Sequence, residues 1–419
     1  MTRNKHHVVV GAGTAGLAAA SAMRDNGFAG RITVVDADPH TPYERPPLSK
    51  EYLSDRRLRE IVAETEYRRL DIELRLGVGV RRLRPSDRRI DTSDGEELVA
   101  DRVLLTTGVA ARRLDVPGAA LGNILTLRDA ADAAALSARL RAGGPLVVVG
   151  GGFVGLEVAA AAADRGIDVT VVELGELPLL AAVGPEIARR ICRLHTERGV
   201  RILTRRTVDA FAGSRTVESV RLSTGERLDA ATVVVGCGVV PNDGLARQAG
   251  VACADGITVD DLGRSSDPWI WAAGDIAAHV NPHLGHRGRI EHWDVARRHG
   301  AAVGASMAGN ATVNREIPYF WSHQYQHTLQ MYGRGRPGDR VIVRDSTTEP
   351  GFVAFWVREG RVAAAAALDE PRDVRSAKIL AENRIEVPDE TLRFAGTDLR
   401  RLVRQLRSPD TRRDIDVTG

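Results

Sequence analysis

The stretch from Val8 to Asp36, VVVGAGTAGLAAASAMRDNGFAGRITVVD, decides the fold. Its order is a β-branched strand, a glycine-rich turn, an alanine-rich helix and a second strand that ends in a carboxylate. The stretch from Leu146 to Glu173, LVVVGGGFVGLEVAAAAADRGIDVTVVE, repeats this order. Each stretch predicts a βαβ unit, and the repeat predicts an α/β protein with two Rossmann-like dinucleotide-binding domains. A chain of 419 residues has room for two or three domains.

Both stretches carry three glycines in the spacing GxGxxG: Gly11, Gly13 and Gly16 in the first, and Gly150, Gly152 and Gly155 in the second. The first glycine permits a tight turn, the second lets the backbone approach a pyrophosphate, and the third lets helix and strand pack closely. The helix N-terminus then offers free N–H groups and a favourable dipole to the phosphates. One copy alone is a weak motif, but two copies in βαβ context predict two dinucleotide sites.

An acidic residue ends the second strand of each unit. Asp36 lies 20 residues after Gly16, and Glu173 lies 18 residues after Gly155. A carboxylate at this position accepts hydrogen bonds from a ribose and repels a 2′-phosphate. No arginine follows Glu173 until Arg189, so the second site is expected to prefer NADH over NADPH. A more distant arginine that folds back toward Glu173 stays an alternative.

The charge is nearly balanced, with 58 Lys and Arg against 55 Asp and Glu, and a net charge of +3. This gives no reason to expect nucleic acid or an acidic membrane as the main partner. Nearly all the positive charge is arginine, because the only lysines are Lys5, Lys50 and Lys378. A lysine inside a motif of such a chain is a candidate for a role that arginine would not serve.

The three cysteines, Cys192, Cys237 and Cys253, show no CxxC or metal-ligand spacing. This argues against a disulfide scaffold, a chain-bound iron–sulfur cluster and a redox-active disulfide. The N-terminus shows no signal peptide. The most apolar long stretch, Leu146 to Ala163, contains four glycines and Glu157 and resembles a strand and helix more than a membrane span. We therefore expect a cytoplasmic protein.

Several further segments resemble the FAD-dependent ferredoxin reductases that serve oxygenases, of the putidaredoxin, rubredoxin and biphenyl dioxygenase reductase type. The most specific is PYERPPLSK, from Pro42 to Lys50. The others are Leu105 to Gly108, Val116 to Ala119, Gly150 to Ala159, Gly236 to Asn242, Ala272 to Ile276, Glu291 to Trp293 and Pro318 to Gln330. The resemblance extends from Val8 to about Arg401. It implies a glutathione reductase-like architecture with a discontinuous FAD domain (1–112 and 242–318), an NADH domain (113–241), a C-terminal α+β interface domain (319–402) and a tail (403–419).

The resemblance also implies cofactor contacts at matching positions. Asp275 would hold the ribityl chain of FAD, and Trp293 would lie near the flavin ring. Expected on the FAD side are Gly11, Gly13, Thr14, Ala15, Gly16, Asp36, Arg45, Lys50, Val80, Thr107, Gly108, Arg128, Gly274, Asp275 and Trp293. Expected on the NADH side are Gly150, Gly152, Phe153, Val154, Gly155, Glu157, Glu173 and Gly238.

Three residues are expected to act in catalysis. In related enzymes a lysine and a glutamate matching Lys50 and Glu157 pair beside the flavin N5 nitrogen. There the cation would stabilise the reduced flavin, and the carboxylate would fix the lysine and contact the nicotinamide carboxamide. Trp321 lies in an aromatic cluster that the family places near the flavin on the side facing the ferredoxin. The alternatives are a solvated lysine, a glutamate on a helix face and a core tryptophan. Ser49 and its neighbours supply no thiol, so disulfide reduction is not expected.

The chain departs from the family where acceptor recognition is expected. His323 and Gln326 stand where acidic residues are usual, and Val109 to Ala111 replaces the usual Ala-Arg-Pro. The spacing of His323 and His327 could place both on one helix face, although a surface or cofactor-facing role is the preferred interpretation. The histidine-rich region from His279 to His299 matches no common zinc site, and we expect no metal.

We expect hydride transfer from NADH to FAD, followed by single-electron transfer to a two-iron ferredoxin that feeds an oxygenase. A monomer or weak dimer is expected, with no nucleic-acid or membrane partner. Two alternatives stay open. In one, the acceptor is a quinone, dioxygen or another small molecule. In the other, the chain is a redox-responsive binding protein like apoptosis-inducing factor, in which a long-lived complex with NADH changes the oligomeric state.

Overall fold

The computed structural model describes residues 4–407, and the chain divides into two compact units. The first unit contains the chain up to Arg112, the short segment Arg128–Ala130, and Val239–Pro318. The second contains Arg113–Leu127, Ala131–Gly238 and the chain from Tyr319 onward. No helix within residues 4–407 has the length and apolarity needed to cross a membrane.

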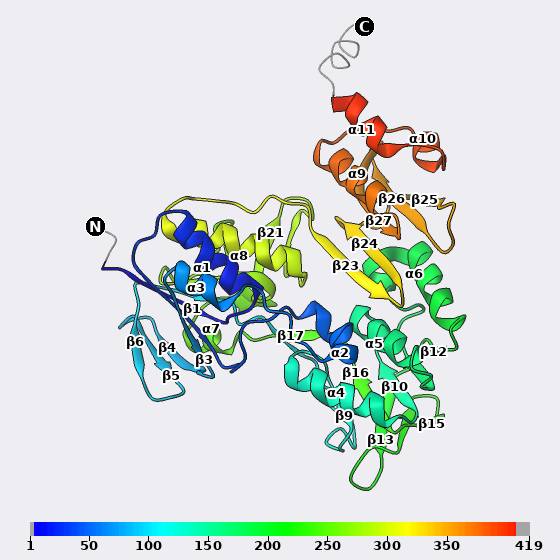
Figure 1. The fold of residues 1–419 in the computed structure, drawn as a ribbon, viewed down its shortest axis with the longest axis horizontal. Helices are drawn as coiled ribbons and strands as arrows, with labels where there is room; N and C mark the ends of the chain where they lie inside the picture. The colour runs from blue at the N-terminus through cyan, green and yellow to red at the C-terminus, as the bar shows by residue number, and fades with distance from the viewer. Residues whose placement is uncertain (1–3, 408–419) are drawn as a thin grey trace, which may run out of the picture. The chain divides into compact units, whose positions relative to one another are not determined.

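A five-stranded parallel sheet forms the centre of the first unit. Its order is β20 (Ile270–Ala272), β7 (Arg102–Leu105), β1 (His6–Val10), β2 (Arg31–Asp36) and β3 (Ile72–Leu76). In the middle strand β1, Val8, Val9 and Val10 are buried in succession, as is usual for a central parallel strand that is covered on both faces. Two helices, α1 (Thr14–Asp25) and α8 (Trp293–Ala308), pack against each other (Figure 1).

The second unit has its own parallel sheet with the corresponding order. It consists of β12 (Arg201–Leu203), β11 (Val169–Val172), β10 (Leu146–Val149), β16 (Thr232–Val235) and β9 (Ile124–Leu125). Its helices are α4 (Ala130–Ala142), α5 (Phe153–Ala163) and α6 (Leu180–Thr196), the last of which is kinked at Gly184. The prediction of two Rossmann-like cores is therefore confirmed.

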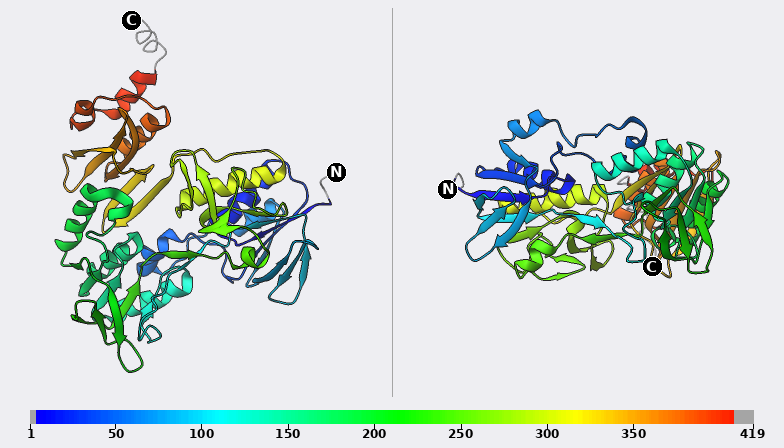
Figure 2. Two further views of the ribbon diagram at one scale, coloured as in Figure 1. Left: turned by 180° about the vertical axis from the view of Figure 1, so that it is seen from behind. Right: turned by 90° about the horizontal axis from the view of Figure 1, so that it is seen from below.

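The internal repeat extends beyond the two βαβ units. A three-stranded antiparallel sheet lies in the chain between β3 and β7 in the first unit and between β12 and β16 in the second. In the first unit it contains β4 (Val80–Arg84), β5 (Arg89–Thr92) and β6 (Glu97–Val99), drawn in blue to cyan in Figure 2. In the second it contains β13 (Val208–Ala212), β14 (Ser219–Leu222) and β15 (Arg227–Asp229).

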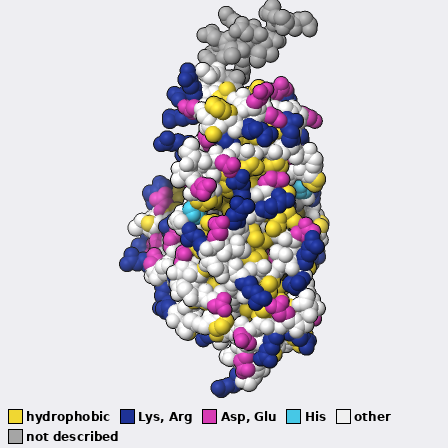
Figure 3. All heavy atoms as spheres, turned by 90° about the vertical axis from the view of Figure 1, so that its right-hand side faces the viewer, with side chains coloured by type: hydrophobic (Ala, Val, Ile, Leu, Met, Phe, Trp, Pro, Cys, Tyr) yellow, Lys and Arg dark blue, Asp and Glu magenta, His cyan; other side chains and the backbone are white. Residues whose placement is uncertain are grey.

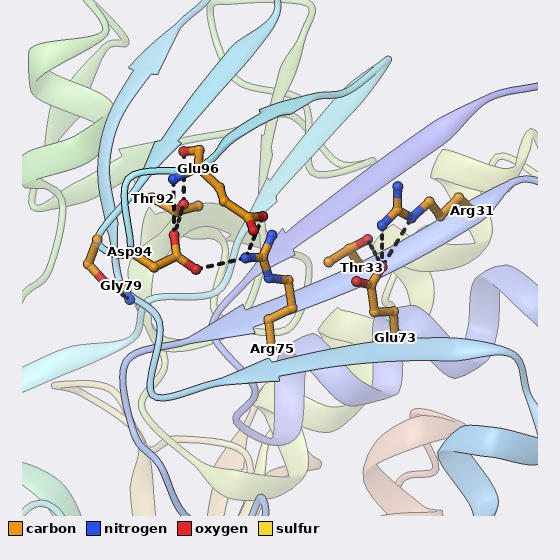
Figure 4. Close-up of polar contacts among 9 residues, drawn as sticks. Arg31, Thr33, Glu73, Arg75, Gly79, Thr92, Asp94 and Glu96 are labelled. Atoms are coloured by element: carbon orange, nitrogen blue, oxygen red, sulfur yellow. Dashed lines mark hydrogen bonds and ion pairs between the residues drawn. The ribbon is translucent and has the colours of Figure 1, made fainter.

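Ion pairs fasten the small sheet of the first unit to the edge of the large one (Figure 4). The Arg75 guanidinium on β3 lies 2.8 Å from both Asp94 and Glu96, which flank the turn between β5 and β6. On the same strand, Glu73 accepts hydrogen bonds from two residues of β2, Arg31 at 2.7 Å and the Thr33 hydroxyl at 2.9 Å. Because Arg75 is only 15% exposed, its two ion pairs are screened less than surface pairs.

The C-terminal part of the second unit is an α+β structure. Its antiparallel sheet has the order β23 (Tyr319–Gln324), β24 (His327–Tyr332), β27 (Arg361–Leu368), β26 (Phe352–Arg358) and β25 (Arg340–Asp345). The helices that follow are α9 (Pro371–Glu382), α10 (Asp389–Arg393) and α11 (Leu399–Arg407). Val403 is buried in their shared core, so the ordered segment continues past residue 402, where a tail was expected to begin. The rest of that tail, 408–419, lies outside the described residues.

The remaining elements are short. In the first unit they are the 3-10 helices η1 (Pro46–Ser49) and η2 (Gly274–Ile276), α2 (Tyr52–Asp55), α3 (Glu64–Arg69), α7 (Gly244–Gln248), β8 (Val109–Ala111), β17 (Val239–Pro241), β18 (Cys253–Ala254), β19 (Gly256–Thr258), β21 (Ala277–Asn281) and β22 (His286–Gly288). The strands β8 and β17 pair antiparallel where the chain leaves and re-enters this unit.

Candidate functional site

The first glycine-rich turn is shaped by contacts that leave no space for a side chain. Gly11 has a φ of +110°, and a Cβ there would lie 2.5 Å from the carbonyl oxygen of Thr106. A Cβ on Gly16 would lie 2.7 Å from the Thr106 hydroxyl. The second turn repeats this arrangement, since a Cβ on Gly150 would lie 2.5 Å from the carbonyl oxygen of Gly236. The outer glycines therefore serve the packing of turn against strand, as the motif predicts.

The middle glycines face open space. A Cβ on Gly13 would meet only the Arg45 guanidinium, at 3.5 Å, and one on Gly152 would meet only a carbonyl oxygen at 3.9 Å. These two glycines are the N-caps of α1 and α5, and neither helix has a side-chain cap or an acidic residue in its first turn within the described chain. Both helices therefore present unsatisfied N–H groups and a positive dipole end to an open region, which fits a pyrophosphate.

The two acidic residues bind the backbone of the glycine turns. Asp36 accepts hydrogen bonds from the backbone N–H of Ala12 at 2.5 Å and of Asp38 at 2.9 Å. Glu173 accepts them from Gly151 at 2.7 Å and from Gly175 at 2.6 Å. Ala12 and Gly151 occupy the same position in their motifs. Each carboxylate therefore holds the turn in place, a structural function that the spacing alone does not reveal.

Two arginines lie beside the second acidic residue. The backbone N–H of Arg206 donates to the carbonyl of Glu173 at 3.0 Å, and that of Arg205 donates to the carbonyl of Gly175 at 2.9 Å. The Arg205 side chain forms an ion pair with Glu176. The arginines near the acid thus come from the segment after β12, farther along the chain than Arg189. This keeps open the alternative that arginine participates in nucleotide selection.

Asp275 sits where η2 meets the start of α1. Its neighbour Gly274 has a φ of +76°, and a Cβ there would lie 2.7 Å from the Ala15 Cβ. Asp275 accepts a hydrogen bond from Arg128 at 3.1 Å. Burial lowers the pKa of the Arg128 guanidinium, and Asp275 partly offsets this effect. The Arg128 guanidinium also lies 3.4 Å from the position that a Cβ on Gly108 would take. It is therefore held between Gly108 and Asp275.

The other residues expected at the first site lie on its surrounding elements. Lys50 ends η1, where its ammonium donates to the carbonyl of Pro46 at 2.9 Å. Val80 begins β4, and Trp293 begins α8 with the Arg297 guanidinium 5.8 Å from its ring. The Thr107 hydroxyl donates to the carbonyl of Asn242 at 3.0 Å. This bond joins the segment before β8 to the segment after β17, the two strands where the chain leaves and re-enters the first unit.

The second site is built on α5. Val154 in its first turn is 42% exposed, so its side chain is accessible to a ligand at the start of the helix. The Phe153 ring lies 4.7 Å from that of Phe320 on β23. Glu157, one turn later, is buried and accepts a hydrogen bond from the Ser322 hydroxyl at 2.6 Å. Gly238 has a φ of +98°, where only glycine is unstrained.

Trp321 lies on β23 and is neither fully buried nor exposed. Its ring stacks on that of Tyr319 with centroids 5.9 Å apart. Because residues two apart on a strand share a face, these rings form an aromatic surface on one side of β23. Trp321 is therefore half-buried on a strand face that it shares with Tyr319.

Sequence reasoning missed the residues that bring α8 against α1. A Cβ on Gly300 would lie 2.8 Å from the Cα of Ala15, and one on Gly304 would lie 2.7 Å from the Cα of Ala19. Small residues four apart on both helices permit this close crossing. The spacing Gly-x-x-x-Gly in α8 was the signal that could have predicted this contact. The close packing of α8 constrains the first turn of α1, where Ala15 lies.

The histidines take roles that sequence spacing did not predict. His323 and His327 lie on the opposite strands of the β23–β24 hairpin, where they pair with Thr328 and Gln324 respectively, so they do not share a helix face. His279 and His299 are buried with ring centroids 4.2 Å apart, and burial lowers the pKa of both. Across residues 4–407, no three His, Cys, Asp or Glu side chains are grouped as a metal site would require.

Comparison with known proteins identifies the family. Residues 5–300 match the pyridine nucleotide-disulphide oxidoreductase family, and residues 319–403 match the reductase C-terminal family. The chain therefore belongs to the pyridine nucleotide-disulphide oxidoreductases, with a reductase C-terminal domain.

Within this family, the chain is similar over nearly its full length to ferredoxin reductase components of oxygenase systems. It is 37% identical to rhodocoxin reductase of Rhodococcus erythropolis, covering 97% of this chain and 96% of the relative. It is 35% identical to the biphenyl dioxygenase system ferredoxin–NAD(+) reductase component of Paraburkholderia xenovorans, covering 94% and 98%. A solved covalent complex of putidaredoxin reductase with putidaredoxin matches with a TM-score of 0.91 and 32% identity, covering 96% and 99%. The resemblance inferred from the motifs is confirmed.

Proposed function

We propose that this protein is an FAD-dependent NADH:ferredoxin reductase that supplies electrons to an oxygenase. The observation that carries the proposal is the pair of uncapped helix N-termini at Gly13 and Gly152. Each lies at a glycine turn that an acidic side chain, Asp36 or Glu173, holds in place. Two dinucleotides therefore have matching phosphate sites on one chain. The relatives described above, one of which is by name a ferredoxin–NAD(+) reductase, support ferredoxin as the acceptor.

The first site would hold FAD and the second NADH. The N–H groups of α1 would bind the FAD pyrophosphate, with Arg45 beside Gly13 adding positive charge. Asp275, oriented by Arg128, would accept a hydrogen bond from the ribityl chain. The N–H groups of α5 would bind the NADH pyrophosphate, and Glu173 would accept from its ribose. FAD, when bound, supplies the conversion of a two-electron donor into single-electron transfers.

Three side chains are proposed for the transfer steps themselves. Lys50 would supply a positive charge that favours reduced flavin. Glu157 would accept a hydrogen bond from the nicotinamide carboxamide and so orient the donor ring. Trp321, on the aromatic surface of β23, would serve electron transfer toward the ferredoxin. These roles rest on the family resemblance together with the positions of the residues on η1, α5 and β23.

The ferredoxin would be an acidic two-iron protein that meets arginines around the site. Figure 3 shows basic and acidic side chains interspersed over the face that it draws. Pairs between carboxylates of the ferredoxin and arginines around the site would set the docking, and its rate would fall with rising salt. A cytoplasmic location, where NADH is the common reductant, and a monomer or weak dimer are part of this proposal.

An acceptor panel tests the proposal. The purified protein would be loaded with FAD and supplied with NADH or NADPH and with a two-iron ferredoxin, a quinone or dioxygen. We expect reduction of cytochrome c by NADH that depends on added ferredoxin. Rapid turnover with quinone or dioxygen alone would favour the small-acceptor alternative. Slow reoxidation with NADH-dependent dimerisation would favour a redox-responsive binding protein.

A further inference from the structure

Four buried polar side chains of the second unit form one continuous series of hydrogen bonds. The Ser322 hydroxyl lies 2.6 Å from Glu157 Oε1, and Gln324 Nε2 lies 2.8 Å from the Ser322 hydroxyl. At the far end, Gln324 Oε1 lies 2.9 Å from His195 Nε2. Glu157 is 5% exposed and the other three are fully buried, so water does not replace these bonds. The series joins α5, the first strand of the C-terminal sheet and α6.

The hydrogens in this series have one consistent arrangement. Ser322 has a single hydroxyl hydrogen, and Glu157 as a carboxylate can only accept, so Ser322 donates to Glu157. The lone pair of Ser322 must then receive a hydrogen from the Gln324 amide nitrogen. This places the Gln324 carbonyl oxygen toward His195, which must donate from Nε2. The opposite orientation of the Gln324 amide would leave one buried acceptor without a hydrogen.

The outer end of the series supports the same direction. The Tyr325 hydroxyl lies 3.2 Å from His195 Nδ1, and as a donor it keeps the proton of His195 on Nε2. Burial lowers the pKa of His195 to about 4, so the imidazole is neutral at physiological pH. Burial also raises the pKa of Tyr325 to about 12, with Arg198 opposing, so the hydroxyl keeps its hydrogen. The Arg198 guanidinium stacks 4.2 Å from the Tyr325 ring and holds it there.

We propose that Ser322, Gln324 and His195 are positioning residues that fix the Glu157 carboxylate for its contact with the nicotinamide carboxamide. The inference rests on the proposed function, because it takes the role of Glu157 from there. All the hydrogens in the series point toward Glu157, so a displacement of its Oε1 atom would break a buried bond. The C-terminal domain thereby contributes to the NADH site through Ser322 and Gln324.

Removal of the Ser322 hydroxyl is the direct test. In Ser322→Ala, Glu157 loses a charge-assisted bond, and we expect flavin reduction by NADH in stopped flow to slow by about ten- to a hundred-fold. The dissociation constant of NADH should change by less than about threefold, because the phosphates and adenosine ribose bind elsewhere on α5 and at Glu173. The matched control is Ser376→Ala, because Ser376 is also buried in the C-terminal domain but its hydroxyl donates to the carbonyl of Arg372. This control should retain the normal rate.

A double-mutant cycle separates this inference from the proposed role of Glu157. If Ser322 acts through Glu157, then Ser322→Ala should have little further effect in a Glu157→Gln background. A normal rate in Glu157→Gln alone would overturn the proposed role of Glu157. A slow Glu157→Gln together with a normal Ser322→Ala, or with fully additive effects, would overturn the positioning series and leave the proposed function intact.

The state of His195 gives a readout that does not depend on activity. In protein labelled with ¹⁵N-histidine, the resonance missing from His195→Gln assigns His195. We expect the neutral form protonated on Nε2 at pH 7, and a changed Nε2 shift in Ser322→Ala because the bond to Gln324 weakens. A proton on Nδ1, or a His195 Nε2 shift that is unchanged in Ser322→Ala, would contradict the proposed direction of the hydrogen bonds. This measurement also decides the matter if Ser322→Ala binds FAD poorly.

Discussion

A methyl group at Gly300 is predicted to force α8 away from α1. In the structure its Cβ would lie 2.8 Å from both the Cα and the carbonyl carbon of Ala15, closer than such atoms pack. The neighbour is backbone and cannot rotate away, so the two helices must separate by a large fraction of an ångström. Ala15 lies in the first turn of α1, the turn proposed to bind the FAD pyrophosphate. Gly300→Ala is therefore expected to affect both stability and cofactor affinity.

The size of the effect follows from overpacking. Insertion of a methyl group into a closely packed contact costs about 1–3 kcal/mol. For a unit of this size, that corresponds to a melting temperature lower by about 2–12 °C. Loss of one well-directed N–H to phosphate bond would weaken FAD binding by about tenfold. Thermal unfolding of the FAD-free protein and titration with FAD measure the two effects separately.

Gly244→Ala is the matched control. Gly244 begins α7 in the same unit, and nothing lies within 4 Å of its Cβ position. Alanine there should be neutral or stabilise by about 0.4–1 kcal/mol. A Gly300→Ala protein that has the same melting temperature as Gly244→Ala and retains normal FAD affinity would refute the close-packing argument.

Three further predictions follow from the site. Burial lowers the pKa of His279, so the folded protein resists the proton that the unfolded chain takes up below about pH 6.5. The unfolding free energy of the unmodified protein should therefore fall between pH 6.5 and 5, by up to about 1.4 kcal/mol per pH unit for each such histidine. In His279→Phe this fall should be smaller, as measured by urea unfolding at each pH. Glu173→Ala should weaken NADH binding by about ten- to a hundred-fold without creating tight NADPH binding, whereas Glu176→Gln should not weaken NADH binding, and equal NADH affinity in both variants would contradict this. Lys50→Ala should slow flavin reduction with FAD still bound, and Lys378→Ala, in which the lost ammonium pairs with Glu382 on α9, should not; an unchanged stopped-flow rate in Lys50→Ala would exclude its proposed role.

The two βαβ units could be predicted because their signals are local. Strand, turn, helix and acid follow one another within 29 residues of chain from Val8 to Asp36. The edge strands of the sheets carry no such signal. β20 pairs with β7, although more than 160 positions of the chain separate them. β9 lies before the second unit's βαβ motif in the chain, although it pairs with β16, which lies after that motif. Long-range pairing of this kind is decided by the packed core rather than by local sequence.

The hairpin between β23 and β24 shows why the histidine spacing misled. Its turn contains Tyr325 at a φ of +59°, and no glycine, asparagine or aspartate marks it. Without a turn residue, the spacing of His323 and His327 remains compatible with a helix. The alternation of buried and half-buried residues along His327 to Tyr332 identifies the strand only once the sheet is known.

The arginines beside Glu173 were also hidden from sequence reasoning. They follow β12, whose position next to β11 is set by the parallel sheet, and that pairing brings residue 205 to residue 175. A search for arginine directly after the acid could not find them. Arg205 and Arg206 must therefore be considered together with Glu173 when nucleotide preference is tested.

The backbone hydrogen bonds accepted by Asp36 and Glu173 affect how a variant with changed nucleotide preference should be designed. Sequence reasoning treats each acid as a ribose ligand. In the structure each carboxylate accepts two backbone N–H bonds and fixes the turn that is proposed to bind a pyrophosphate. Removal of the Glu173 carboxylate is therefore expected to weaken the binding of NADH and NADPH alike. A change toward NADPH therefore requires a side chain that still accepts from Gly151 and Gly175, combined with release of Arg205 from Glu176.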